Sequence, residues 1–217
     1  KINISERAQI RSVMSQSQQI IYDYSVKDII EMGWISSLND TSKKDFHIAL
    51  EEISKKCEII DILNRRFNNL SGGEQRKVHF ARTLIQLNNI NQKNKYMFFD
   101  EPTANLDISH ELNFIKILEE KANEGFGIFL ILHDLELAYN FSDKIAFMKE
   151  GKIMYHGEPN SVKTLSDEPD VDNSLHLFIV DYVKCKLFMD KSATSSPEDA
   201  SRQMTLSNMH ERKWKDA

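Results

Sequence analysis

Leu70–Arg76, with the sequence LSGGEQR, is a glycine-rich turn that opens a helix, and the fold can be inferred outward from it. Backbone N–H groups at a helix N-terminus lack partners within the helix, and the helix dipole favours an anion there. Glycine has no Cβ, so a ligand can come close to the backbone. The turn therefore suits a phosphate group such as those of ATP. Ser71 and Glu74 also have capping-box spacing, so a capped surface helix without a ligand is the alternative.

A second stretch, Lys95–Pro102, favours the phosphate interpretation. Its apolar part predicts a buried parallel strand, and Asp100 and Glu101 follow at the carboxyl end. Ligands of α/β sheets bind at that edge. One carboxylate there can hold Mg²⁺, and a second can polarise an attacking water. The alternative is an acidic turn before a proline.

With these stretches the sequence resembles the ABC ATPase family. Five ordered motifs carry the resemblance, which covers about residues 1–165. They are a Q-loop entry at Arg11–Gln16, an LSGGQ-type signature with Glu in the Gln position at Leu70–Arg76, Walker B with its glutamate at Phe98–Pro102, a D-loop at Asn105–Asp107 and a switch histidine at Ile131–Asp134.

The resemblance implies roles for four residues around one nucleotide. Glu101 would be the general base for the attacking water, and Asp100 would hold the Mg²⁺ shell. Gln16 would touch Mg²⁺ or the water and report to a membrane partner. His133 would hydrogen-bond the γ-phosphate and orient the water at Glu101. ATP and Mg²⁺ are the implied cofactors.

Further residues would act on the nucleotide of a second subunit, in a head-to-tail dimer that closes on two ATP molecules. Ser71, Gly72 and Gly73 would clamp that nucleotide through hydroxyl and amide groups, together with Glu74 of the signature. Asp107 would tie one site to the other.

Two of these residues, His133 and Gln16, could also have no role in catalysis. An isolated histidine at a strand end is more often structural, but the apolar run Ile128–Leu132 and the following Asp134 favour the switch role for His133. Gln16 stands near equally polar glutamines, and only its position after the predicted strand selects it.

The phosphate-binding pattern G-x-x-x-x-G-K-[ST] occurs nowhere among the seven glycines. Only 15 residues precede Gln16, whereas a strand, loop, helix and returning strand need roughly 30. The chain also opens at Lys1 rather than Met. We therefore expect a fragment whose Walker A segment precedes Lys1, and we expect this chain alone to be inactive. Loss of the family's P-loop strand should leave an edge uncovered beside the Walker B strand.

Composition is that of one domain with a real core, since 41% of the 217 residues are hydrophobic and 28% are charged. The net charge of −5 and the lack of a basic block argue against nucleic acid as a partner. No apolar run is long enough to span a membrane. Two cysteines, Cys57 and Cys185, predict buried thiols in a reducing compartment.

Periodicity predicts an α/β fold. We expect helices over 5–9, 25–32, 41–57, 72–87, 108–124 and 135–140, and strands over 10–14, 95–100, 126–132, 144–149 and 152–156. The fold class is then a P-loop NTPase-like ABC ATPase core with an α-helical signature subdomain, lacking the Walker A segment. Residues 1–165 would be a partial ABC ATPase domain, with the helical subdomain at about 20–90. Residues 166–217 would be a divergent or weakly ordered tail, with a helix or strand near Leu175–Val183.

The spacing of the motifs and the local sequence indicate which branch of the ABC ATPase family the chain resembles. About 55 residues separate Gln16 from Ser71 without a long heptad run, which argues against repair and chromosome-organising ATPases. Tyr24–Gly33 and Leu106–Glu111 resemble importers of iron-siderophore, cobalamin and heme type. The segment 81–95 resembles the heme importers in particular.

The resemblance implies an ATP-binding and ATP-hydrolysing subunit of a bacterial ABC importer of heme. Its partners would be transmembrane permease subunits, a second ATPase subunit in a homodimer and, indirectly, a periplasmic substrate-binding protein. It would lie peripherally on the cytoplasmic face of the plasma membrane. The alternatives are a non-transport ABC ATPase in DNA maintenance or translation, and a non-catalytic remnant that acts only through a partner.

Overall fold

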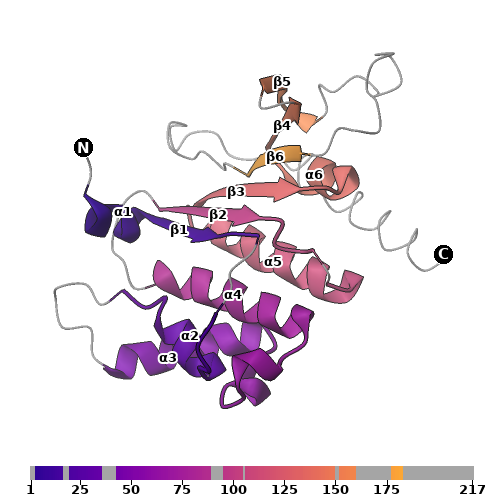
Figure 1. Cartoon of the computed structure of the whole chain (residues 1–217). Coiled ribbons are helices and arrows are strands. Elements are labelled where there is room, and N and C mark those ends of the chain that lie inside the picture. The colour runs from indigo at the N-terminus through magenta and orange to yellow at the C-terminus, as the bar shows by residue number, and fades with distance from the viewer. Residues whose placement is uncertain are drawn as a thin grey trace, which may run out of the picture. The chain divides into compact units, whose positions relative to one another are not determined.

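A six-stranded sheet with the order β1-β2-β3-β6-β4-β5 organises the computed structural model (Figure 1). The structure describes residues 3–16, 20–35, 43–88, 95–104, 106–149, 152–159 and 177–182. The combination of a partly parallel sheet with helices confirms the predicted α/β class.

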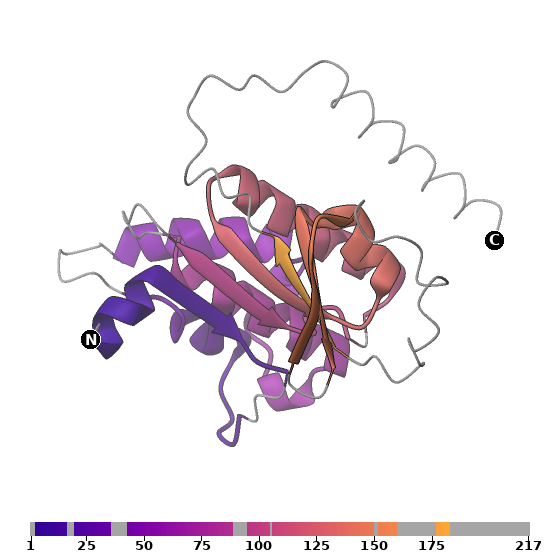
Figure 2. The same cartoon turned by 90° about the horizontal axis from the view of Figure 1, so that it is seen from above.

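Three parallel strands form one half of the sheet and lie side by side in the view from above (Figure 2). They are β1 at Arg11–Met14, β2 at Tyr96–Asp100 and β3 at Gly127–Leu132. Because the strands are parallel, their carboxyl ends meet at one edge of the sheet.

The other half of the sheet contains β4 at Lys144–Lys149 and β5 at Lys152–Gly157, the two strands predicted there, which pair antiparallel. The strand β6, Leu177–Tyr182, lies between β3 and β4 and is antiparallel to both. Of the two conformations expected near Leu175–Val183, the strand is the one found. It lies beyond residue 165, so the sheet takes in part of the 166–217 segment. The rest of that segment is outside the described residues.

The expected uncovered edge beside the Walker B strand, which is β2, is wrong. Tyr96 pairs with Arg11 on one side and with Gly127 on the other, so β2 has a parallel neighbour on both sides. The next position, beside β3, is filled by β6. The expectation failed because strand order depends on long-range pairing, which local sequence does not encode.

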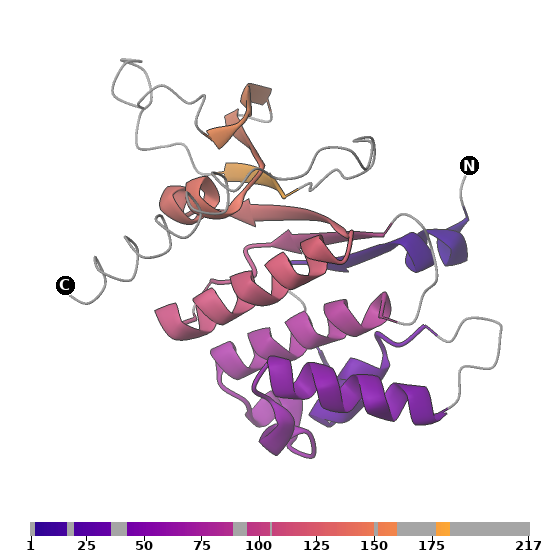
Figure 3. The same ribbon diagram turned by 180° about the vertical axis from the view of Figure 1, so that it is seen from behind.

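Helices cover one face of the parallel strands in layers (Figure 3). The helices α4, Gly72–Gln86, and α5, Ile108–Asn123, lie next to the strands, and α2, Val26–Glu31, and α3, Lys43–Lys56, pack against α4. The remaining short elements are α1 at Ile4–Ile10, η1 at Ile60–Ile62, η2 at Phe67–Asn69 and α6 at Leu135–Phe141. All the predicted helices are found, with boundaries that differ by up to two residues.

Local signals explain where several helices begin. Ser25 accepts a hydrogen bond from the Asp28 amide, and Asp28 accepts one from the Ser25 amide, so a capping box starts α2. The same arrangement joins Asn3 and Glu6 at α1, where the sequence analysis had not predicted it.

The core joins the strand that carries the acidic pair to both neighbouring helices. Phe80 of α4 stacks on Phe114 of α5 with ring centroids 3.9 Å apart, and its centroid is 5.4 Å from that of Phe99 in β2. All three rings are buried. Aromatic pairs of this geometry contribute beyond the area that they bury. This cluster holds α4 in place against β2.

Cys57 is buried, as predicted, and desolvation raises the pKa of its thiol to about 12. Cys185 lies outside the described residues. Within the described ranges, no helix combines the length and the apolar character needed to cross a bilayer.

We expect Phe80→Ala to lower the free energy of unfolding by about 3–5 kcal/mol, since it leaves a cavity between two helices and the sheet. Urea denaturation followed by circular dichroism measures the loss. Tyr22→Ala, at a ring that is 70% exposed, is the matched control and should change stability little. Equal losses in the two variants would contradict the described packing.

Candidate functional site

Three predicted catalytic side chains meet at the carboxyl edge of the parallel strands. Gln16 follows β1, Glu101 follows β2 and His133 follows β3. Gln16 Nε2 donates a hydrogen bond of 2.8 Å to Glu101 Oε2, and His133 Nε2 contacts Glu101 Oε1. The two oxygens of one carboxylate are thus held by residues from the two flanking strands.

Glu101 stands in an unusual backbone conformation. Its φ angle is 49°, in the left-handed region that non-glycine residues rarely adopt. Its amide donates to the Ile131 carbonyl at 3.0 Å, and its side chain is only 11% exposed. Strained positions of this kind concentrate at functional sites. The carboxylate of Glu101 is nearly buried and lies between the side-chain amide of Gln16 and the imidazole of His133. A carboxylate placed in this way can accept a proton from a positioned water.

Asp100 ends β2 and is half-buried beside this cluster. The described residues contain no group of three or more potential ligands that could hold a metal by themselves. Mg²⁺ commonly takes only one or two protein carboxylates, with phosphate oxygens and water in the other positions. The Asp100 carboxylate, at the end of β2, could be one such ligand.

The signature turn forms the capping box that its spacing predicts. The Glu74 amide donates to Ser71 Oγ at 3.3 Å, while Glu74 Oε2 accepts from the Ser71 amide at 2.8 Å. Hydrogen bonds from Ser71 lower the pKa of the Glu74 carboxyl. Arg65 also forms an ion pair with Glu74, at 2.9 Å.

The capping box does not exclude an anion. It uses the Glu74 amide, whereas the amides of Gly72 and Gly73 precede the first intrahelical hydrogen bonds. A Cβ built on Gly72 would meet no atom within 4 Å, so packing inside this chain does not require a glycine there. Open space beside free amides suits a ligand that comes from outside the chain.

Asp107 forms side-chain contacts at the start of α5. It is the N-cap of α5, where its Oδ1 accepts from the His110 amide at 2.9 Å and lies 2.7 Å from His110 Nδ1. These hydrogen bonds lower the pKa of Asp107. This cap was not predicted, although an aspartate directly before an apolar helical pattern signals one. Asn105, the first residue of the predicted D-loop, lies outside the described residues.

Arg76 is the residue at this site to which sequence reasoning assigned no role. Its Nη1 donates to the Gln16 carbonyl at 2.8 Å, and its Nη2 donates to the Glu101 carbonyl. No local signal reveals these contacts, since the partners are 60 and 25 residues away along the chain.

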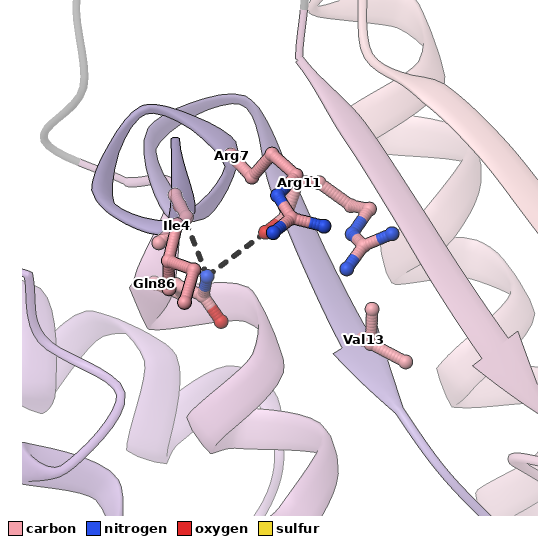
Figure 4. Close-up of a pocket in the computed structure, with 6 residues that line it drawn as sticks. Ile4, Arg7, Arg11, Val13 and Gln86 are labelled. Carbon is pink, nitrogen blue, oxygen red and sulfur yellow. Dashed lines mark hydrogen bonds between the residues drawn. The ribbon is translucent and has the colours of Figure 1, made fainter. Parts of the chain in front are cut away.

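A pocket of about 310 Å³ lies where α1, β1 and the end of α4 come together (Figure 4). Gln86 Nε2 donates there to the carbonyls of Ala8 and Arg11, at 3.0 and 2.9 Å. The other lining residues are Ile4, Arg7 and Val13. None of the predicted site residues lines this pocket.

Comparison with known proteins gives consistent matches. Residues 2–104 match the family model described as ABC transporter. The chain is 36% identical over 163 residues to the hemin import ATP-binding protein HmuV of Escherichia coli O157:H7, covering 75% of this chain and 62% of that protein. It is 34% identical over 169 residues to HmuV of Bartonella henselae, covering 77% and 64%. The chain thus spans less than two thirds of the length of these relatives.

Solved structures agree in fold. A metal-chelate type ABC transporter in an inward-facing conformation superposes with a TM-score of 0.59 at 21% identity, over 73% of this chain and 62% of that one. The protein cbiO1 from Clostridium perfringens, part of the ABC transporter complex cbiONQ, gives 0.55 at 25% identity, over 73% and 61%.

Acid should weaken the capping box at the signature turn. The folded-state pKa of Glu74 is lowered, so this contribution to stability is present above the ordinary value of 4.5 and is lost as pH falls through the lowered pKa. We expect Glu74→Gln to be less stable than the parent chain at neutral pH, by a small margin because the site is exposed to solvent. Urea midpoints measured against pH should converge in acid. A constant difference at all pH values would contradict this linkage.

Proposed function

Because residues 2–104 match the family model described as ABC transporter, we propose that this chain is a member of that family and an ATP-binding and ATP-hydrolysing subunit that powers a bacterial importer of heme. The observation that carries the proposal is the contact of Gln16 and His133 with the single carboxylate of Glu101 at the edge of the parallel sheet. The names of the relatives, which are hemin import ATP-binding proteins, support heme over iron-siderophore or cobalamin substrates.

In the proposed reaction, water attacks the γ-phosphorus of ATP and Glu101 Oε accepts the proton of that water. The bond between the γ-phosphorus and the β,γ-bridging oxygen breaks, so that ADP leaves. Gln16 Nε2 and His133 Nε2, which bracket the carboxylate, orient it towards the water. His133 is 53% exposed and can therefore also reach a phosphate oxygen. Asp100 would hold Mg²⁺, which neutralises charge that develops on the phosphate oxygens.

The signature turn would serve a nucleotide bound to a second ATPase subunit in a homodimer. The amides of Gly72 and Gly73 lie in the first turn of α4. The Ser71 hydroxyl donates to Glu74 Oε2 at 2.9 Å and would turn from it to the nucleotide. Glu74 supports the turn, and Asp107 would contact the second subunit. Donors fixed in this way stabilise charge on a γ-phosphate without reorganising.

A surface for permease subunits is also part of the proposal. Ile21 and Tyr22 follow closely after Gln16 and are 85% and 70% exposed. Large exposed apolar side chains in neighbouring positions indicate a protein interface. A permease bound there would hold the chain at the cytoplasmic face of the plasma membrane and connect it indirectly with a periplasmic substrate-binding protein. The proposal includes no nucleic acid partner.

The 217-residue chain alone should not turn over ATP. No G-x-x-x-x-G-K-[ST] loop is present in the sequence to hold the β- and γ-phosphates. Phosphate release from purified chain with Mg²⁺ and ATP should equal that of buffer. Turnover that Glu101→Gln abolishes would contradict this prediction.

Paired with an intact ATPase subunit that carries the loop, the chain should complete one of two composite sites through Ser71–Gly73. We expect Ser71→Arg in this chain to lower the ATPase rate of the isolated mixed dimer at least about tenfold, because a bulky cation blocks the signature amides. Glu101→Gln in this chain should change the rate little, because its carboxylate serves the incomplete site.

The two substitutions control for each other, since both are placed in this chain only. Loss of the rate with Glu101→Gln and retention with Ser71→Arg would contradict the role proposed for the signature turn.

A further inference from the structure

Arg76 connects two backbone segments that carry catalytic side chains. Its guanidinium donates at 2.8 Å to the carbonyl of Gln16, at the end of the segment that leaves β1. It also donates to the carbonyl of Glu101, the residue with the left-handed backbone. One side chain therefore holds the main chain beneath both partners of the 2.8 Å hydrogen bond between Gln16 and Glu101.

The environment of Arg76 distinguishes this contact from a surface ion pair. The residue is half-buried, and desolvation lowers its pKa, against the opposing effect of the charges of Glu101 and Asp100. Within the part of the chain that the structure describes, its buried Nε has no hydrogen-bond partner. A cation that is partly removed from water and donates to two carbonyls is costly unless both bonds form. Arg76 therefore needs both carbonyls, of Gln16 and of Glu101, in the right place at once.

The position of Arg76 on α4 links these carbonyls to the signature turn. Ser71 is the N-cap of the same helix, less than two turns away. Arg76 and Phe80 are four residues apart, so both lie on the helix face that packs against β2. At the other end of α4, Gln86 donates to the carbonyls of Ala8 and Arg11. The helix is therefore fastened at both ends to the segment that contains β1.

We propose that Arg76 is a positioning residue that couples the signature turn at the N-terminus of α4 to the backbone of Gln16 and Glu101 in the same chain. The signature turn, which faces the nucleotide of the second subunit, and the backbone of Gln16 and Glu101, which belongs to this chain's own site, then move together. This coupling rests on the proposed function, because it needs a nucleotide from the second subunit at Ser71–Gly73. Arg76 does not touch that nucleotide and acts through the helix.

The test measures transmission of a signal rather than stability. The 217-residue chain is paired with an intact, loop-bearing subunit, and amide hydrogen exchange is followed with and without Mg²⁺ and ATP. Nucleotide held by the intact subunit should protect the signature turn of this chain at residues 71–74. With Arg76 present, we expect the protection to extend to Glu101. In Arg76→Gln, protection at 71–74 should remain and the protection at Glu101 should be lost.

Two further variants separate coupling from a general loss of structure. Arg65→Gln is the matched control, because Arg65 contacts Glu74 of the signature but not Gln16 or Glu101. It should keep the protection at Glu101. Arg76→Lys keeps a cation without the two-pronged guanidinium and should restore that protection in part.

The possible results separate this proposal from the proposed function. Protection at 71–74 that reaches Glu101 equally in the parent chain and in Arg76→Gln would overturn the coupling role while leaving the signature role intact. Protection at 71–74 that never reaches Glu101, even in the parent chain, would also overturn it. Absence of any nucleotide-dependent protection at 71–74 would overturn both the signature role and the coupling that depends on it.

Discussion

Parallel register between three strands is the constraint on which the site depends. Met14 of β1 is paired with Phe99 of β2, and Gln16 and Glu101 each follow two residues later. Asp100 is in turn paired with Ile131 of β3, which brings His133 to the same edge. A slip of one residue in either pairing would turn the following side chains to the opposite face of the sheet. The contacts of Gln16 and His133 with Glu101 are thus a direct consequence of strand pairing.

Packing beneath the sheet adds a second level of control. Phe80 brings α4 against Phe99 of β2, and Phe114 closes the cluster from α5. One turn earlier on the same face of α4, Arg76 reaches the carbonyls of Gln16 and Glu101. The packing of Phe80 on Phe99 therefore places α4 close enough to β2 for Arg76 to reach these carbonyls. The buried aromatic cluster and the sheet edge that carries Gln16 and Glu101 are parts of one arrangement.

The signature turn shows how one local structure can serve two purposes. Ser71 and Glu74 satisfy each other and stabilise the start of α4 whether or not a ligand is present. The amides of Gly72 and Gly73 still have no partner within the helix, because intrahelical bonding begins only later. Stability of the turn and affinity for an anion are therefore compatible. The sequence left two alternatives for this turn, a capped helix and a phosphate site. The structure is compatible with both at the same time.

The sequence by itself determined the α/β class, the predicted helices and the strands β1 to β5 to within two residues, the capping box at Ser71, and the resemblance to ABC ATPases. These features depend on periodicity, capping and glycine content, which act over a few residues. Only the tertiary structure decided the antiparallel insertion of β6 between β3 and β4, the closed pairing on both sides of β2, and the contacts of Arg76. Each of these joins segments that are distant along the chain. The local sequence does not specify which distant segment a strand or side chain will contact. Strand order and the contacts of a long side chain such as Arg76 depend on how the whole core packs.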